Sequence, residues 1–335
     1  MVDSLNHGKV IVGILSKDCA QQLRQCLDSL LNQSFTNFEV VVVDGGSKDN
    51  SLHLLKEYSQ KDKRVHYFVQ RSKGTGMARN ELIDYVRKNL PECQKIVWGD
   101  AENVYDQNYL QNIVSKSASV VGGTNIVDSR KPLAQSLWWY YNGLRGKAIS
   151  GNNECVDIKV YDKHRYINAL RGEDFVFHRE LVKESYKLDH CSQAVCYIKT
   201  VESFGDFIDW TRRKARGFSQ WASQRRGVML PLFLRYFLFN ALMWSYILLF
   251  FLLVLTLPYL LLPYLLLPLM LSLYFWQKGK LYVKGMKKIT FFYFLPVLFL
   301  HFSVLFYELF KLTVSKIPSS RELLSAGNLH CCIII

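Results

Sequence analysis

Short hydrophobic runs alternate with segments of helical periodicity along the first hundred residues. The runs are rich in Val and Ile, have the length of buried strands, and occupy residues 9–15, 38–44, 65–69 and 95–99. Helical patterns separate them, for example near 50–58 and 77–88, and Asp18 with Gln21 predicts a capping box for the first helix. This alternation predicts an α/β fold with a mostly parallel sheet covered by helices on both faces.

The second half of the chain has a different pattern. Residues 236–276 contain no charged side chain, and as one helix this run of 41 residues would be about 60 Å long, twice the thickness of a bilayer core. Prolines divide it, so the pattern predicts membrane spans near 232–256 and 259–276. A third apolar segment, 289–310, is predicted to be a further span or a re-entrant or interfacial segment.

Four regions follow from these patterns. They are a catalytic domain, a basic amphipathic or interfacial helix, a membrane region of two or three helices, and a tail, at residues 1–204, 205–227, 228–313 and 314–335. The terminal Cys332-Ile-Ile-Ile also fits a prenylation pattern, although four residues are weak evidence.

Charge and cysteine usage narrow the location. The formal net charge is +14, and lysines crowd between the apolar segments, a pattern typical of an anionic membrane surface rather than of a nucleic-acid partner. The eight cysteines have no CxxC spacing, and the N-terminus has no apolar signal region. We therefore expect an integral membrane protein whose catalytic domain faces the reducing cytosol.

Carboxylates follow two of the predicted strands. Asp44 ends the second strand and Asp100 ends the fourth, where ligands of parallel sheets bind, although an aspartate here often only caps a turn. Glu102 follows Asp100 at a spacing that, in extended backbone, points both carboxylates to one side. The pair predicts a Mg²⁺ or Mn²⁺ site that holds phosphates, with a solvated acidic turn as the alternative.

Two further segments carry candidate chemistry. Glu173 and Asp174 are adjacent acids, which suit the acceptance of a proton from an attacking hydroxyl or, alternatively, a helix N-terminus. The stretch 210–221 includes Arg213 and Arg216, which suit diphosphate oxygens or an anionic lipid surface. His178 is expected to be a packed neighbour rather than a ligand.

Four blocks in order, "VIVGILSKD", "VVVDGGSKDNS", "GTGMARNELI" and "WGDAE", resemble glycosyltransferase family 2 over roughly residues 9–226. The resemblance implies a GT-A-like nucleotide-sugar-binding domain. It also implies that Leu15 and Ser16 line the nucleotide pocket, that Asp44 binds the base, and that Arg79 approaches the nucleotide or its phosphates. Glu102 stands where a second aspartate is commoner.

The resemblance further implies roles for the remaining candidates. Asp100 with Glu102 corresponds to the metal-and-diphosphate site, Asp174 to the catalytic base, and Glu173 to its neighbour. Arg213 and Arg216 lie in a stretch that loosely resembles a diphosphate-binding element.

These observations together predict a membrane-bound, metal-dependent inverting glycosyltransferase. Its partners would be a nucleoside-diphosphate sugar, a glycan or polyprenyl-phosphate acceptor and the lipid bilayer, with no nucleic acid. A non-catalytic membrane scaffold that retains the nucleotide-binding fold is the alternative, and a channel or transporter is a poorer one.

Overall fold

The hydrophobic runs of the first hundred residues lie side by side in one sheet. The computed structural model describes residues 8–136, 149–168, 172–223 and 229–256, with scattered positions between 266 and 307. The first four strands are β1 (Lys9–Ser16), β2 (Phe38–Asp44), β3 (Val65–Val69) and β4 (Cys93–Asp100). They pair in parallel in the order β3-β2-β1-β4, so the predicted parallel arrangement is confirmed for this part of the sheet.

The other half of the sheet is mixed, and the prediction of a mostly parallel sheet is wrong there. The remaining strands are β5 (Val104–Tyr105), β6 (Val120–Val127), β7 (Asn153–Asp157) and β8 (Leu188–Ile198). β7 lies between β4 and β6 and runs antiparallel to both, whereas β6 and β8 are parallel. β5 is antiparallel to β8 as well, so two strands run against the other six and the eight-stranded sheet is mixed.

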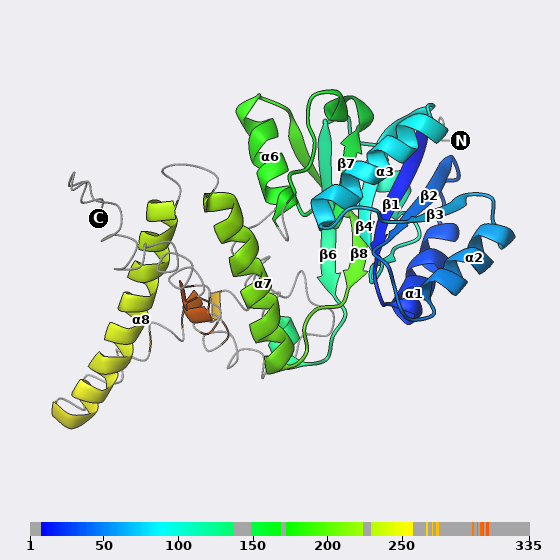
Figure 1. Ribbon diagram of the computed structural model, residues 1–335. Coiled ribbons are helices and arrows are strands. Elements are labelled where there is room, and N and C mark those ends of the chain that lie inside the picture. Colours follow the sequence, from blue (N-terminus) through cyan, green and yellow to red (C-terminus); the bar gives the residue numbers. More distant parts are fainter. Residues whose placement is uncertain are drawn as a thin grey trace, which may run out of the picture.

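Helices cover both faces of the sheet (Figure 1). The helices α1 (Ala20–Leu31), α2 (Ser51–Lys61) and α4 (Tyr109–Val114) contribute to one hydrophobic core. The helices α3 (Thr75–Asn89) and α6 (Glu173–Lys183) contribute to a second core. The predicted layered α/β fold is therefore confirmed.

Alternation along the strands explains the two cores. Val10, Val12 and Ile14 of β1 belong to the core under α1, whereas Ile11 between them belongs to the core under α3. Successive side chains of a strand point to opposite faces, so a strand covered on both sides is hydrophobic throughout. The buried indole of Trp98 in β4 donates to Tyr161 Oη at 2.6 Å, which satisfies its polar group.

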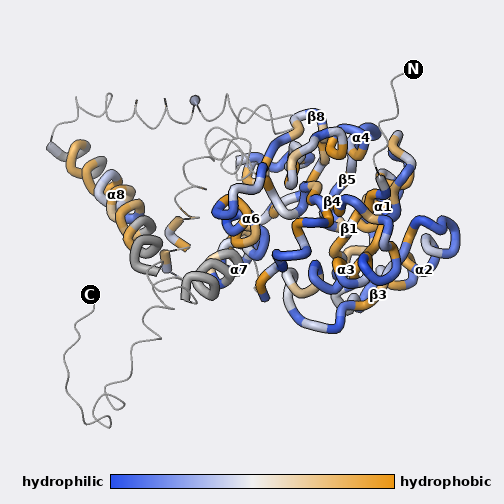
Figure 2. Tube along the Cα trace, turned by 90° about the horizontal axis from the view of Figure 1, so that it is seen from above, coloured by the Kyte–Doolittle hydropathy of each residue, from blue (hydrophilic) through white to orange (hydrophobic). Residues whose placement is uncertain are grey.

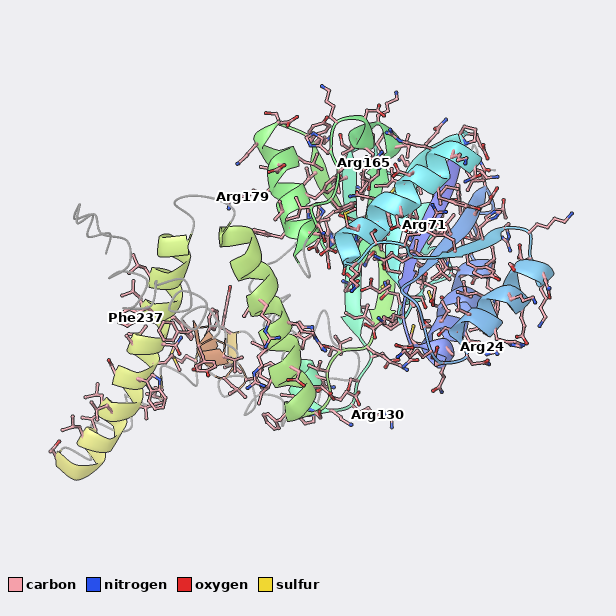
Figure 3. The ribbon with its side chains drawn as sticks, viewed as in Figure 1. Arg24, Arg71, Arg130, Arg165, Arg179 and Phe237 are labelled. Carbon is pink, nitrogen blue, oxygen red and sulfur yellow. The ribbon has the colours of Figure 1, made fainter. Side chains whose placement is uncertain are left out.

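Two long helices follow the sheet. α7 (Phe204–Ser223) lies between the α/β part and α8 (Met229–Thr256), and both Figure 1 and Figure 2 show this arrangement. The described part of α8 is largely hydrophobic in Figure 2, and Phe237, labelled in Figure 3, is 46% exposed on it.

No helix within the described residues meets the length and apolarity needed to cross a membrane. The predicted span at 232–256 therefore lacks support, although α8 occupies it, whereas most of the predicted segments 259–276 and 289–310 lies outside the described residues. The segment 257–265, the tail 314–335 and Cys332 lie outside the described residues.

Candidate active site

The strand ends bring four of the predicted site residues to one edge of the sheet. In the strand register Ser16 is opposite Asp44, and Leu15 is opposite Asp100. The two aspartates therefore end the strands on either side of β1. This is the point where the chain order of the strands reverses, and α/β sheets bind ligands beyond the carboxyl ends of the strands at such a point.

Asp44 is fully buried, and its carboxylate organises the loop that follows it. Oδ1 accepts hydrogen bonds from the backbone N–H groups of Gly46 at 2.9 Å and Ser47 at 2.7 Å, and Oδ2 accepts one from Ser47 Oγ at 2.6 Å. Gly46 has φ +79°, which favours glycine. The loop-capping alternative thus describes part of what Asp44 does, and its contact with a base stays a prediction.

The Asp100–Glu102 pair lies in a turn, so the expectation of extended backbone through both residues is wrong. β4 ends at Asp100, and the N–H of Asn103 donates to the carbonyl oxygen of Asp100 at 3.1 Å, which closes the turn. Asp100 is half-buried and Glu102 is exposed. The N–H of Ala101 still donates to the carbonyl oxygen of Leu15 at 3.2 Å, and the turn beyond it leaves Glu102 in solvent.

The turn of Asp100 and Glu102 suits a divalent metal that takes only one or two ligands from the protein. Within the described part of the chain, no group of three or more His, Cys, Asp or Glu side chains is placed to hold a metal ion. Mg²⁺ commonly binds proteins through one or two carboxylates and completes its shell with water and substrate phosphates. Asp100 and Glu102 supply hard oxygen ligands of that kind, so they fit a metal that arrives with a phosphate-bearing substrate.

The predicted acid pair opens helix α6. Gly172 precedes the helix in the left-handed conformation, with φ +86° and ψ 13°, and turns the chain so that Glu173 and Asp174 form the first turn. Glu173 is 5% exposed and accepts from Arg79 Nε at 3.4 Å. Asp174 is half-buried and accepts from the N–H of Gly151 at 3.1 Å.

Arg79 joins the acid pair to the sheet. Its side chain is 3% exposed, its Nη2 donates to the carbonyl oxygen of Gly151 at 2.7 Å, and its guanidinium lies 4.8 Å from the ring centre of Trp98 and 5.3 Å from that of Tyr166. Its buried Nη1 has no hydrogen-bond partner within the described residues. An unsatisfied buried N–H group is costly, so this nitrogen suits an oxygen of a bound ligand.

Arg79 differs from the arginines that cover the surface. Five of these are labelled in Figure 3 and are exposed, namely Arg24, Arg71, Arg130, Arg165 and Arg179.

The acids and Arg79 share one electrostatic environment with Asp100. The pKa of Glu173 is raised to about 6: burial is the largest cause, Arg79 lowers it, and Asp174 and Asp100 raise it. Burial alone would lower the pKa of Arg79, but Tyr166, Glu173 and Asp100 are among the groups that raise it above its usual value. The strand-end aspartate and the acid pair of α6 therefore act at short range on the same groups.

A further buried acid, which no sequence pattern indicated, contacts helix α6, the helix that carries Glu173 and Asp174. Glu154 of β7 is fully buried, hydrogen-bonds with Nε2 of His178, and accepts from Tyr166 Oη at 3.4 Å. His178 is thus a packed neighbour, as expected, and Glu154 raises its pKa although burial lowers it. The strand around Glu154 reads Asn-Glu-Cys-Val-Asp, with polar residues at both ends, so its local sequence does not separate a site residue from an edge residue.

Arg213 and Arg216 lie on α7, and both are exposed. Their contact with a diphosphate or with lipid stays a prediction.

Comparison with known proteins assigns the fold to a family. Residues 11–143 match the family described as Glycosyl transferase family 2, and residues 141–277 match Glycosyl transferase family group 2. The chain therefore carries a glycosyltransferase family 2 domain.

Two curated relatives share this similarity. The glycosyltransferase GlyA of Streptococcus pneumoniae is 28% identical over 138 residues, which is 41% of this chain and 18% of GlyA. EpsH of Bacillus subtilis is 30% identical over 195 residues, which is 53% of this chain and 55% of EpsH. The matched parts thus span less than two thirds of either relative.

A solved structure shows the same fold. The mannosyltransferase PcManGT of Pyrobaculum calidifontis, in complex with GDP-Man and Mn²⁺, superposes with a TM-score of 0.52 at 17% identity. The superposition covers 65% of this chain and 64% of PcManGT.

Proposed function

We propose that this chain is a glycosyltransferase that moves a sugar from a nucleoside-diphosphate sugar to an acceptor hydroxyl. The observation that carries the proposal is the sheet edge where Asp44 and Asp100 end strands on either side of β1, with the acids of α6 acting on the same groups as Asp100. The family 2 domain supports it, as does the fold shared with a protein that binds GDP-Man and Mn²⁺.

The donor would lie across the ends of β1, β2 and β4. Leu15 and Ser16 would line the nucleotide, the remaining acceptor capacity of Asp44 would serve the base, and the unpartnered Nη1 of Arg79 would donate to an oxygen of the donor. Asp100 and Glu102 would hold Mg²⁺ or Mn²⁺. The metal supplies charge neutralisation for a departing diphosphate.

Asp174 is the proposed catalytic base. The acceptor oxygen attacks the anomeric carbon and forms the new glycosidic bond, its proton passes to Asp174, and the bond to the diphosphate breaks with its electron pair on the leaving oxygen. Attack from the face opposite the leaving group inverts the anomeric centre. The pKa of Asp174 is lowered: burial opposes this, and His178, Arg79 and the Gly151 N–H bring it about, so the base is ionised at neutral pH.

A hydroxyl acceptor suits this site better than a phosphate. A phosphate oxygen is already ionised at neutral pH and needs no base, whereas a hydroxyl does. A glycan hydroxyl is therefore the proposed acceptor, and a polyprenyl phosphate is the second candidate because the C-terminal half is so apolar.

We also propose that the chain is membrane-bound with the catalytic domain on the cytosolic side. α8 exposes many large apolar side chains, including Leu234, Phe237, Leu238, Leu242, Trp244, Leu248, Leu249 and Leu252. The six cysteines in the described residues are all free thiols, as suits a reducing compartment. Flotation of the full chain with anionic vesicles at high salt tests this, and a chain that stays at the bottom of the gradient would remove the membrane from the proposal.

Transfer assays test the function. The purified chain is incubated with Mn²⁺, a panel of nucleoside-diphosphate sugars and candidate glycan or polyprenyl-phosphate acceptors, and the products are identified by mass spectrometry and NMR. We expect a product of inverted anomeric configuration, with loss of at least a hundredfold in kcat for Asp174→Asn. Absence of turnover with every donor would favour the non-catalytic scaffold, and a retained anomeric configuration would exclude Asp174 as an inverting base.

A further inference from the structure

The loop before β7 contacts both parts of the proposed site. The N–H of Gly151 donates to Oδ2 of Asp174 at 3.1 Å, and its carbonyl oxygen accepts from Nη2 of Arg79 at 2.7 Å. A single residue therefore binds the proposed base and the arginine that pairs with Glu173. Both partners are on helices, so the loop fixes α6 and α3 to each other at this point.

The same loop is tied to the turn that carries the proposed metal ligands. Asn103 is fully buried, and its Nδ2 donates to the carbonyl oxygen of Asn152 at 2.7 Å. The N–H of Asn103 closes the turn on Asp100. Gly151 directly precedes Asn152 in the chain, so a continuous path of covalent and hydrogen bonds joins Asp100 to Asp174.

Polar side chains hold this loop in place. Oδ1 of Asn152 accepts from Ser150 Oγ at 2.6 Å and from Asn125 Nδ2 at 3.2 Å, while Asn153 Nδ2 donates to Asn125 Oδ1 at 2.6 Å. Tyr109 Oη donates to Asn153 Oδ1 at 2.6 Å. Networks of buried hydrogen bonds of this kind favour one geometry, because each broken bond leaves a buried polar group unsatisfied.

The packing around Gly151 leaves no room for a side chain at this position. A Cβ added at Gly151 would lie 2.6 Å from Cβ of Asp174 and 3.1 Å from Nη2 of Arg79. The first distance is shorter than carbon atoms tolerate, so any side chain at this position displaces the proposed base. A glycine here serves the close approach of α6 to the loop.

We propose that Asn103 and Gly151 are positioning residues that fix the base Asp174 relative to the turn of Asp100 and Glu102. The proposal rests on the proposed function and adds how its two halves are kept in register. Transfer needs the acceptor oxygen, held by the base, in line with the bond to the diphosphate, and a displacement of about 1 Å can cost on the order of a hundredfold in rate. Neither Asn103 nor Gly151 contacts the donor or the acceptor in this account.

Two variants test the bridge, by which we mean the path from Asn103 through Asn152 and Gly151 to Asp174, and one control variant removes a similar bond elsewhere. Asn103→Ala removes its side-chain link to the loop, and Gly151→Ala displaces Asp174. Asn112→Ala is the control, because Asn112 Nδ2 also donates to a distant backbone carbonyl, that of Gln193, at 2.9 Å. Cooperative thermal unfolding establishes that each variant is folded, and Gly151→Ala carries the test if Asn103→Ala is not.

We expect kcat to fall at least tenfold in both bridge variants, while the dissociation constant of UDP with Mn²⁺ changes less than about threefold. The acid limb of the kcat–pH profile should move upward by at least half a pH unit in Gly151→Ala, because Asp174 loses the hydrogen bond from the Gly151 N–H. The other groups that face Asp174 remain: Arg79, His178 and the Phe175 N–H still lower its pKa, and the neighbouring carboxylate of Glu173 repels it. A purely structural role would not move this limb.

The outcomes separate the two proposals. An inactive wild-type chain would refute the proposed function. An active wild type with kcat and the acid limb of the folded bridge variants within twofold and a tenth of a pH unit of Asn112→Ala would refute the bridge alone.

Discussion

His178 shows how a single side chain sets the chemistry of the proposed base. It lies one helical turn after Asp174 and is hydrogen-bonded to the buried Glu154. Burial lowers the pKa of His178 and Arg79 lowers it too, but Glu154 and Asp174 outweigh them and raise it. Protonation of His178 adds a second positive charge, beside that of Arg79, against the carboxylates of Glu154, Glu173 and Asp174.

His178→Gln tests this charge. A group whose folded-state pKa is raised stabilises the fold fully below its unfolded pKa, near 6.5, and loses that contribution as the pH rises through the folded value. We therefore expect His178→Gln to lower the free energy of unfolding more at pH 5.5 than at pH 8.5, by at least about 1 kcal/mol, in urea titrations. His53→Gln, which removes an exposed histidine near Glu57, is the control, and an equal loss at both pH values would show that His178 is neutral.

Asp44 and Glu154 show what single-residue patterns can and cannot predict. The position of Asp44 at a strand end was predictable, because β-branched runs locate strands well. That its carboxylate caps its own loop depends on the left-handed Gly46, a backbone conformation that no pattern specifies. Glu154 acquires its meaning only from His178, 24 residues away, and such distant pairs are invisible in local sequence.

At the scale of elements, local patterns predicted where helices and strands lie better than they predicted the hydrogen bonds at helix ends. The strand at 65–69 and the helix around 77–88 are present as β3 and α3. The capping box of Asp18 and Gln21 is wrong: α1 begins after Cys19, and the N–H of Ala20 donates to Asp49, 29 residues further on. Strand order, and β7 running against its neighbours, follow from tertiary packing and not from periodicity.

Helix α6 depends on the left-handed residue before it. Gly172 has φ +86°, and nothing lies within 4 Å of a Cβ placed there, so a side chain meets backbone strain but no clash. We expect Gly172→Ala to lower the free energy of unfolding by about 1–2 kcal/mol and to reduce kcat, because Glu173 and Asp174 follow directly. Gly172→Asn should recover most of both, since asparagine tolerates this conformation. Equal losses for alanine and asparagine, measured by urea unfolding and steady-state kinetics, would argue against backbone strain as the cause.

At the scale of the whole molecule, the sequence separates a catalytic part from an apolar one. The α/β part was predictable because strand and helix periodicities are strong there. The membrane region was predicted from hydropathy alone, and within the described residues no helix qualifies as a span. Membrane attachment is therefore a proposal that the flotation experiment tests. The strand register, in contrast, directly places Leu15, Ser16, Asp44 and Asp100 at one edge of the sheet.

The central claim is that this edge binds a nucleoside diphosphate together with a divalent metal. Because two carboxylates hold such a metal weakly without phosphate ligands, metal and nucleotide should bind cooperatively. The direct measurement is calorimetric titration of UDP and GDP into the full chain with Mn²⁺ or with EDTA, for wild type and Asp100→Asn. We predict binding of at least one nucleotide that needs Mn²⁺ and weakens at least tenfold in Asp100→Asn. Equally tight binding with EDTA, or in Asp100→Asn, would contradict the account.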